Sequence, residues 1–392
     1  MPIKNKKYII LNFLHGNSPY LRTIEMALAV NDELEKRGME RMGIIIPLVY
    51  KERQKEIIKH NFRHYLKKYP DELLLDEKLG EYLWSIFYNG DGFDKWLDNF
   101  LKKEKGVTER IKNYLNKGLS VENLSGKKFS INKKNIAIEI NRCPLVSFDI
   151  KPSYFASFGY MSDILERSIL EDGLDLDKNV LKNGIKYFED LEKKQTVRFI
   201  AEPATFSYLD NWISRHDSEI FTPPNTNQKL NLNFLKNLFL KRGIYVTITG
   251  VYGLSRLFEE IQKTGLKIYT HKLGVIPSGK KALPDIIMHK NILLHFARIG
   301  WGSAWLSFMT ETPLITFPYD FKDDPEVYFN NICIEKLGIG KVYKGESLEQ
   351  LLAFGEEYKN KVKLIKQDLI KKYGTINGVE YTAQKIADHY LS

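Results

Sequence analysis

The part of the chain that decides the fold reads Arg298-Ile299-Gly300-Trp301-Gly302-Ser303-Ala304-Trp305. It lies between two apolar runs, so it predicts a strand, a glycine turn, a helix and a further strand. Gly300 and Gly302 let the backbone approach a ligand closely. The N–H groups of a helix that starts near Ser303 suit a diphosphate, and Arg298 can add a cationic contact. An ordinary strand-to-helix turn, with the two tryptophans in the core, fits the same pattern.

The same order of strand, turn, helix and strand recurs on the N-terminal side of this stretch. Ile244–Ile248 is an apolar, β-branched run followed by Thr249-Gly250, a helix to about Lys263 and a second run at Leu266–Tyr269. This order predicts a βαβ unit with parallel strands.

The chain also begins with this order of strand, turn, helix and strand. Lys7–Phe13 is a short apolar run that ends at His15-Gly16-Asn17-Ser18-Pro19, and apolar residues then recur at helical spacing up to Arg37-Gly38. Met42–Val49 is the next run of strand length. Parallel sheets built in this way bind ligands at the carboxyl ends of their strands.

The segment from Lys51 to about Asn123 has a helical pattern rich in aromatic residues and lysine, and predicts a helical insertion in the first domain. Further strands are expected after it. They are Ile136–Ile140, Leu145–Asp149 and Val197–Glu202.

Two prolines in a polar cluster, Pro223 and Pro224, predict a linker because proline neither continues a helix nor fits a central strand. We therefore expect an N-terminal domain over residues 1–222, a linker over 223–235 and a C-terminal domain over 236–375. The last helix, residues 376–392, is expected to pack back on the N-terminal domain.

The composition fits a globular chain of this size. The sequence has 392 residues, 43% hydrophobic and 12% aromatic, enough to bury two cores. Its two cysteines, Cys143 and Cys333, are expected to be core thiols. No run of about 18 apolar residues and no signal-peptide pattern is found, so a cytoplasmic location is expected.

The formal net charge of +10 favours an anionic partner: nucleic acid, an acidic membrane face or a phosphorylated ligand. The basic, amphipathic stretch Lys51–Lys68 is typical of a peripheral membrane contact, and equally of a solvated helix with one core face. No nucleic-acid-binding module is recognisable, so nucleic acid is not expected as a partner.

The stretch around Gly300 resembles the donor-binding signature of inverting GT-B glycosyltransferases. Plant-type UDP-glycosyltransferases carry His-x-Gly-Trp-x-Ser, which Gly300-Trp301-Gly302-Ser303 fits, with Arg298 at the histidine position. The bacterial lipid-intermediate N-acetylglucosaminyltransferases have an arginine there. Pro313 and Pro318 also match prolines of both groups. The resemblance implies an α/β fold of two Rossmann-like domains with parallel sheets.

Later elements are similar to the family's Asp-Gln, Asn-Ala and Gly-x-Gly elements: Asp323-Asp324-Pro325-Glu326, Asn330-Asn331 and Leu337-Gly338-Ile339-Gly340. Two positions differ. The family's ribose-binding glutamate falls on Leu306, and its sugar-binding glutamine falls near Pro325 or Glu326. The nucleoside and the sugar therefore stay open.

The resemblance implies a set of site residues, each of which also fits an ordinary turn or structural role. The donor-binding candidates are Thr249, Gly250, His295, Arg298, Gly300, Gly302, Ser303, Asp323, Asp324 and Glu326. The acceptor loop is Gly16, Asn17 and Ser18, and the candidate general base is His15. Counting back from Pro19 places Gly16, one residue later, at the usual base position. Asp149 is a candidate for the aspartate that orients the base.

The expected function is a metal-independent, inverting hexosyl transfer from a nucleotide-diphosphate sugar, with a UDP-sugar favoured, to an acceptor hydroxyl. The nucleotide-sugar is a co-substrate and no cofactor is expected. The acceptor (glycan, lipid or small molecule) stays open. The alternatives are a non-catalytic sugar-nucleotide-binding protein and a sugar-nucleotide epimerase on the same fold.

Overall fold

The computed structural model describes residues 6–90, 92–202, 215–226, 240–247, 255–271, 276 and 279–392, without the side chains of Asn17 and Ser255. These residues form two compact units. The first contains the described residues up to 202, from 215 to 225 and from 378 to 392; the second contains those from 226 to 377.

The first unit is built on a nine-stranded sheet in the order β5-β4-β3-β2-β1-β6-β7-β8-β9. Strands β1 to β3 and β6 to β9 pair in parallel, and β4 and β5 add an antiparallel edge. The strands are β1 (Tyr8–Phe13), β2 (Gly43–Pro47), β3 (Leu73–Asp76), β4 (Leu119–Asn123), β5 (Lys128–Ile131), β6 (Ile136–Arg142), β7 (Ser153–Ser157), β8 (Val197–Ala201) and β9 (Glu219–Thr222).

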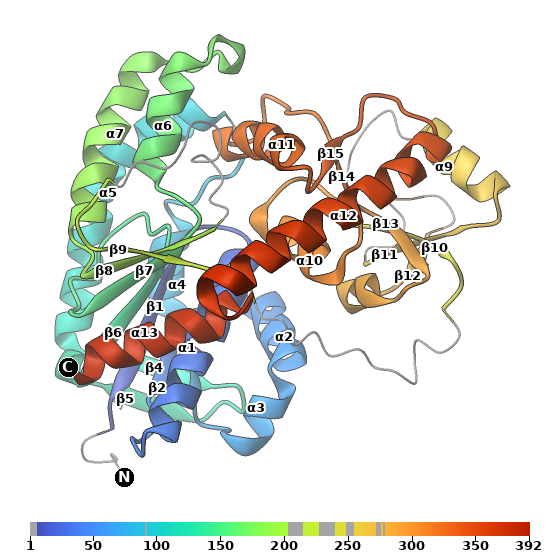
Figure 1. Cartoon of the computed structure of the whole chain (residues 1–392). Helices are drawn as coiled ribbons and strands as arrows, with labels where there is room; N and C mark the ends of the chain where they lie inside the picture. The colour runs from blue at the N-terminus through green and yellow to red at the C-terminus, as the bar shows by residue number, and fades with distance from the viewer. Residues whose placement is uncertain are drawn as a thin grey trace. The chain divides into compact units, whose positions relative to one another are not determined.

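Helices cover this sheet. Figure 1 shows α1 and α13 together, while α5, α6 and α7 pack on one another away from them. The helices are α1 (Asn17–Lys36), α2 (Lys51–Asn61), α3 (Arg63–Lys68), α4 (Glu77–Trp84), α5 (Phe93–Lys117), α6 (Met161–Leu170), α7 (Lys178–Lys193) and α13 (Gly378–Leu391), with the 3-10 turns η1 (Lys133–Asn135) and η2 (Asp172–Leu174).

The second unit holds a six-stranded sheet, all parallel, in the order β12-β11-β10-β13-β14-β15. Its strands are β10 (Gly243–Val246), β11 (Lys267–Thr270), β12 (Lys280–Lys281), β13 (Ile292–Phe296), β14 (Leu314–Thr316) and β15 (Lys341–Val342). Its helices are α9 (Ser255–Lys263), α10 (Trp301–Thr310), α11 (Pro325–Leu337) and α12 (Leu348–Tyr373), with the turn η4 (Pro284–Met288).

The predicted fold class, α/β with parallel sheets, is confirmed. The expected βαβ unit at the start of the chain is present, because β1 and β2 pair in parallel with Tyr8 opposite Gly43. In the second unit β10 and β11 also pair in parallel, and α9 connects them in the sequence.

Two expectations for the first unit differ from the structure. The segment expected to be helical contains helices α2 to α5 and also β3 and β4, so it extends the sheet. The expected strand at Leu145–Asp149 is wrong, and the next strand is β7. Asp149 has φ 54, a left-handed conformation that a strand does not tolerate.

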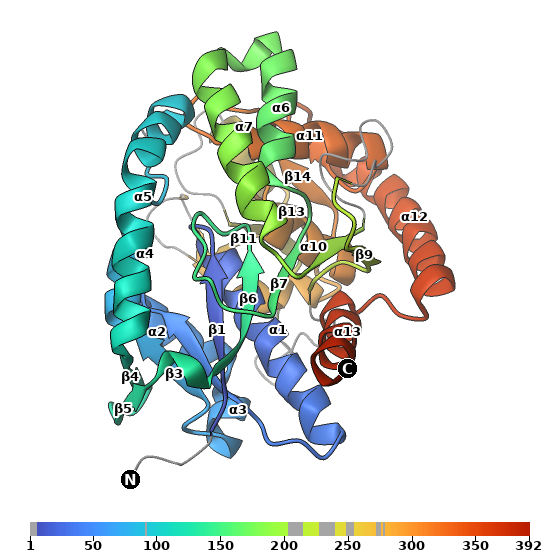
Figure 2. The ribbon, with the colours of Figure 1, turned by 90° about the vertical axis from the view of Figure 1, so that its left-hand side faces the viewer.

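The C-terminal helix α13 lies beside α1 in the first unit (Figures 1 and 2). The Gly378 N–H donates to the Pro224 carbonyl at 3.1 Å, and the Thr382 hydroxyl donates to the Asn225 side-chain oxygen at 3.1 Å. The start of the segment expected as a linker therefore packs against α13, while residues 227–235 lie outside the described residues.

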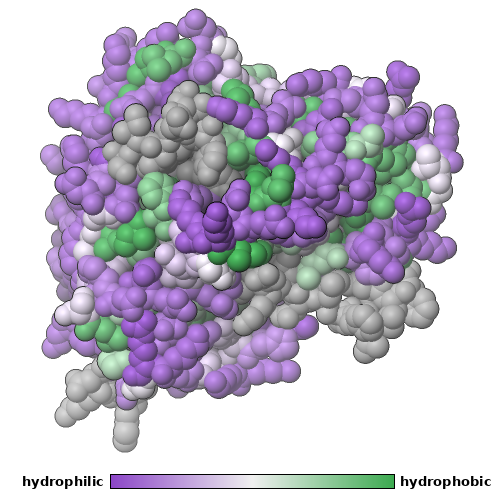
Figure 3. Space-filling model, viewed as in Figure 1, coloured by the Kyte–Doolittle hydropathy of each residue, from purple (hydrophilic) through white to green (hydrophobic). Residues whose placement is uncertain are grey.

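Helices α2 and α3 carry the basic amphipathic stretch. Ile58 and Phe62 are buried in the core of the first unit, and Tyr65 packs against that core. The apolar side thus faces inward, and a membrane contact, which stays a prediction, would involve the basic side chains. Within the described part of the chain, no helix is long and apolar enough to cross a bilayer. The face shown in Figure 3 is hydrophilic over most of its described surface.

Two helical glycines give a matched test of the packing. A Cβ at Gly80 in α4 would lie 2.2 Å from the Leu48 carbonyl oxygen, whereas a Cβ at Gly106 in α5 would meet nothing within 4 Å. We expect Gly80→Ala to lower the free energy of unfolding by about 1–3 kcal/mol through overpacking. Gly106→Ala should raise it by about 0.5–1 kcal/mol. Calorimetric melting of both variants checks this, and equal shifts would contradict the packing of α4 on Leu48.

Candidate functional site

Each sheet has a point at which its strand order reverses. In the second unit, β10 has β11 on one side and β13 on the other. In the first unit, β1 has β2 on one side and β6 on the other. Open α/β sheets bind ligands at such points, outside the carboxyl ends of the strands. The segments that follow β10, β13, β1 and β6 are therefore the places to look for a site.

The segment after β13 is the glycine turn that begins at Arg298. Helix α10 starts at Trp301 with Gly300 as its N-cap residue, two residues before the expected start at Ser303. Stacking of Trp301 on Trp305, with ring centroids 5.0 Å apart, fixes the first turn. The Ser303 and Ala304 N–H groups both donate to the Gly300 carbonyl at 3.0 Å.

The start of α10 can hold an anion. A helix leaves its first N–H groups without partners inside the helix and carries partial positive charge at this end. A Cβ at Gly300 would meet nothing within 4 Å, so there is space beside the turn. Gly300, Gly302 and Ser303, all candidates from the sequence, lie together here.

Arg298 connects this turn to the acidic segment after β14. Its guanidinium forms an ion pair with the Asp323 carboxylate, and the Asp320 N–H also donates to Asp323, at 3.0 Å. The Arg298 side chain stays 40% exposed. It is thus held in place and still open to a ligand.

The acidic candidates lie at the start of α11. Asp324 is the N-cap residue, and Glu326 in the first turn accepts a bond from the Asn330 side-chain amide at 3.2 Å. Burial, together with the charges of Glu326 and Asp323, raises the pKa of the Asp324 carboxyl. A carboxyl that keeps its proton more easily can donate a hydrogen bond as well as accept one.

His295 is fully buried in β13. One ring nitrogen lies 2.7 Å from the Ser307 hydroxyl and the other 3.2 Å from the Thr247 hydroxyl. Burial lowers the pKa of the imidazole to about 3, so the ring is neutral. His295 thus ties β13 to α10 and to the end of β10, and its role in donor binding stays a prediction. Thr249 and Gly250 lie outside the described residues.

In the first unit, the turn after β1 lies beside the end of β6, since the Leu14 N–H donates to the Arg142 carbonyl at 3.1 Å. Gly16 has φ 104 and ψ 160, a conformation that essentially requires glycine, and is the N-cap residue of α1. The Gly16 N–H donates to the Tyr50 hydroxyl at 2.5 Å. Ser18 follows in the first turn of α1, as does Asn17, whose side chain is not described.

His15 sits between aromatic rings. Its imidazole makes edge contacts with Phe87 and Tyr88, at centroid distances of 6.3 and 5.8 Å. Burial lowers the pKa of the imidazole to about 4, so the ring is neutral at pH 7 and can accept a proton. Sequence reasoning missed Phe87, Tyr88 and Tyr50, because they belong to other elements than the turn.

The orienting aspartate suggested by the resemblance is engaged elsewhere. The Asp149 carboxylate pairs with the Lys112 ammonium at 2.8 Å, and the Ser147 hydroxyl donates to it at 3.1 Å. Among the described residues, the buried Nδ1 atom of His15 has no hydrogen-bond partner. The same residues include no group of three acidic, histidine or cysteine side chains that can hold a metal ion.

Comparisons with known proteins identify the fold. TcCGT1 in complex with UDP matches with a TM-score of 0.61 and 12% identity, covering 98% of this chain and 99% of that one. UGT71G1 of Medicago truncatula, complexed with UDP-glucose, matches with a TM-score of 0.56 and 14% identity, covering 100% and 99%. The glycosyltransferase SnogD of Streptomyces nogalater matches with a TM-score of 0.52 and 13% identity, covering 98% of this chain and 99% of that one. No family model and no curated protein sequence matches the chain significantly.

The chain therefore has the GT-B fold of two Rossmann-like domains and resembles UDP-glycosyltransferases in structure, at low sequence identity. The predicted fold is confirmed at this level.

The buried His295 makes stability depend on pH. Its pKa in the folded state, about 3, is below its usual 6.5, so protonation favours the unfolded chain. The contribution of neutral His295 is complete above pH 6.5 and is lost as pH falls below it. We expect the stability gap between the wild type and His295→Gln to narrow by about 1.4 kcal/mol per pH unit from pH 6.5 to 4. Denaturant unfolding at several pH values measures this difference in stability. A difference that does not change with pH would show that His295 is not a buried, neutral imidazole.

Proposed function

We propose that this protein transfers a sugar from a UDP-sugar to an acceptor hydroxyl with inversion at the anomeric carbon. One observation carries the proposal. The two motifs that resemble the family lie where a doubly wound sheet binds ligands: His15-Gly16 follows β1, and the turn at Gly300 follows β13. Strand-order reversals are the places where open α/β sheets bind ligands.

On the donor side, Arg298 and the start of α10 would hold the diphosphate. Negative charge grows on this group as the sugar–oxygen bond breaks. Fixed N–H dipoles and a guanidinium that is already oriented by Asp323 stabilise that charge without reorganising. The carboxylates of Asp323 and Glu326 and the carboxyl of Asp324 are proposed to accept bonds from sugar hydroxyls.

On the acceptor side, His15 is the proposed general base. The acceptor hydroxyl attacks the anomeric carbon, its proton passes to the imidazole, and the nucleoside diphosphate leaves. The low pKa of His15 keeps the imidazole in the proton-accepting form at neutral pH. The Tyr50 hydroxyl bonded to Gly16 and the rings of Phe87 and Tyr88 fix the position of the loop.

UDP is the proposed nucleotide because the similar structures TcCGT1 and UGT71G1 were solved with UDP and UDP-glucose. The ribose contact must differ from that of the family. Leu306, at the position of the ribose glutamate, packs partly buried against the cluster around Tyr245 and Ile287. A hexose, as in UDP-glucose, is the proposed sugar.

We expect Arg298→Ala to weaken UDP binding about tenfold or more, because it removes a hydrogen bond to a charged group. Arg63→Ala, on the exposed side of α3, is the control for loss of one positive charge. Calorimetric titration with UDP, dTDP, GDP, ADP and CMP measures the affinities. Equal UDP affinity in the wild type and Arg298→Ala, or no binding of any of these nucleotides, would refute the donor site.

We expect His15→Ala to lower kcat by about 10²–10⁴-fold with UDP affinity unchanged, as loss of a general base does. His60→Ala, an exposed histidine on α2, should have wild-type turnover. UDP release from UDP-glucose with a panel of phenols measures turnover. A wild-type rate in His15→Ala would show that a different group acts as the base, whereas no UDP release by the wild type with any phenol would favour the non-catalytic alternative.

The pH profile tests the same residue independently. With a His15 pKa of about 4, kcat/KM should stay level from pH 7 down to pH 5 and fall only below that. An acid limb centred near pH 6.5 that persists in His60→Ala would show that His15 titrates as an exposed histidine.

A further inference from the structure

The net charge of the chain is concentrated in two segments of the first unit. Helices α2 and α3, residues Lys51–Lys68, contain seven basic and two acidic residues. The segment from the start of β4 to the end of η1, Leu119–Asn135, contains four basic residues and one acidic residue. Of the 59 basic and 49 acidic residues of the chain, 11 and 3 lie in these two segments. They therefore carry +8 of the formal net charge of +10.

The two segments are neighbours in space. The Lys55 ammonium of α2 pairs with the Glu122 carboxylate of β4 at 2.9 Å. Lys127, in the turn before β5, pairs at 2.8 Å with Asp71, which lies between α3 and β3. Figures 1 and 2 both show α2, α3, β4 and β5 in the lower part of the first unit. The positive charge is thus gathered on one side of the unit.

Four lysines on this side are exposed and not neutralised. They are Lys59 on α2, Lys67 on α3, Lys128 on β5 and Lys134 on η1, and we call them the basic face. Within the described ranges of the chain, none of the four forms an ion pair with a carboxylate. Ammonium groups that are left without counter-charges attract an anionic partner.

The apolar side chains of these helices face inward, which decides the kind of contact. Ile58 and Phe62 are buried in the core. Tyr65 packs against the same core, and its hydroxyl donates to the Asp32 carboxylate at 2.6 Å. These side chains are therefore not available to insert into a bilayer, and the two rings are not available to stack on nucleic-acid bases.

The type of basic residue points the same way. Nine of the 11 basic residues in the two segments are lysines. Lysine lacks the planar fork with which arginine binds bases and phosphates in a fixed geometry. A fluid layer of anionic lipid headgroups requires no fixed geometry and attracts lysine clusters by charge density alone.

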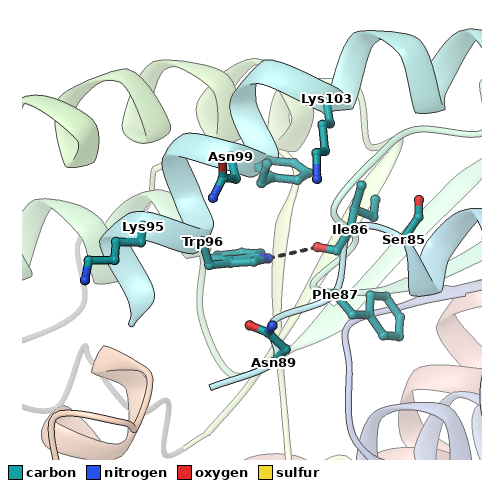
Figure 4. Close-up of a pocket in the computed structure, with 9 residues that line it drawn as sticks. Ser85, Ile86, Phe87, Asn89, Lys95, Trp96, Asn99 and Lys103 are labelled. Carbon is teal, nitrogen blue, oxygen red and sulfur yellow. Dashed lines mark hydrogen bonds between the residues drawn. The ribbon is translucent and has the colours of Figure 1, made fainter. Parts of the chain in front are cut away.

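A second group of lysines in the first unit has a different setting. Lys95 and Lys103 line a pocket of about 290 Å³ between α5 and the segment Ser85–Asn89, together with Asn99 and Trp96 (Figure 4). A pocket encloses one small ligand, whereas the basic face presents charges from four elements on an open surface. The pocket lysines are therefore kept in every variant.

We propose that the basic face binds the surface of an anionic lipid bilayer by charge attraction, without insertion of apolar side chains. This inference goes beyond the transfer proposed above and does not depend on it. Each lysine close to an anionic leaflet raises the affinity roughly fivefold, and the attraction falls off within a Debye length.

The test is sedimentation of the full chain with vesicles. We expect the wild type to bind vesicles of phosphatidylcholine that contain one third phosphatidylglycerol, and not vesicles of phosphatidylcholine alone. Binding should be lost as NaCl rises from about 0.05 to about 0.5 M, because salt screens exposed charges. Lys59→Gln/Lys67→Gln/Lys128→Gln/Lys134→Gln should weaken binding at least about tenfold.

The matched control is Lys182→Gln/Lys186→Gln/Lys361→Gln/Lys363→Gln. It removes the same charge and the same residue type from exposed positions on α7 and α12. It should bind the anionic vesicles as the wild type does. Thermal melting of both variants, followed by circular dichroism, checks that each is folded.

Three results would overturn the proposal. The first is no binding of the wild type to the anionic vesicles, and the second is an equal loss in the two variants, which would indicate general charge attraction. The third is binding that persists at high salt, which would indicate insertion. A DNA duplex that binds more tightly than the vesicles, and whose binding is lost in the basic-face variant, would assign this surface to nucleic acid instead. The vesicle measurements use no nucleotide, so their outcome is independent of the proposed transfer.

Discussion

The parallel pairing of a first strand with neighbours on both sides is the constraint on which the rest of this structure depends. β1 lies between β2 and β6, and β10 lies between β11 and β13. Within each sheet these strands point the same way, so their carboxyl ends meet at one edge of that sheet. The connections leave that edge in opposite directions. Space for a ligand arises there without any specific side chain.

Burial at these edges then sets the chemistry. His15 follows the central strand β1, and His295 lies within β13. Desolvation keeps both rings neutral, with pKa values of about 4 for His15 and about 3 for His295. Their exposure differs in kind. His295 has both ring nitrogens bonded within the second unit, so it holds β13, α10 and the end of β10 together. His15 is bordered by rings and is proposed to act on a proton. The same loss of solvent keeps His295 neutral for its two hydrogen bonds and keeps His15 in the proton-accepting form.

Much of the fold could be predicted from periodicity and turn chemistry. β1, α1 and β2 were expected from an apolar run, a glycine turn and helical spacing, and β10, α9 and β11 in the same way. The prediction failed where the local signal was short or ambiguous. Leu73–Asp76 is a strand of four residues between helices, and such a run cannot be told from a helix by pattern alone. Leu145–Asp149 is apolar enough for a strand, but the backbone turns at Asp149.

The sequence by itself determined the two βαβ units, the two glycine turns and the resemblance of Gly300-Trp301-Gly302-Ser303 to a donor-binding signature, because these depend on residues adjacent in the chain. Only the tertiary structure decided what surrounds each candidate. It paired Arg298 with Asp323, buried His295 completely, and placed Tyr88 between His15 and Trp96. Such contacts join residues from different elements, and desolvation and charge pairing depend on distance in space, which no local pattern contains.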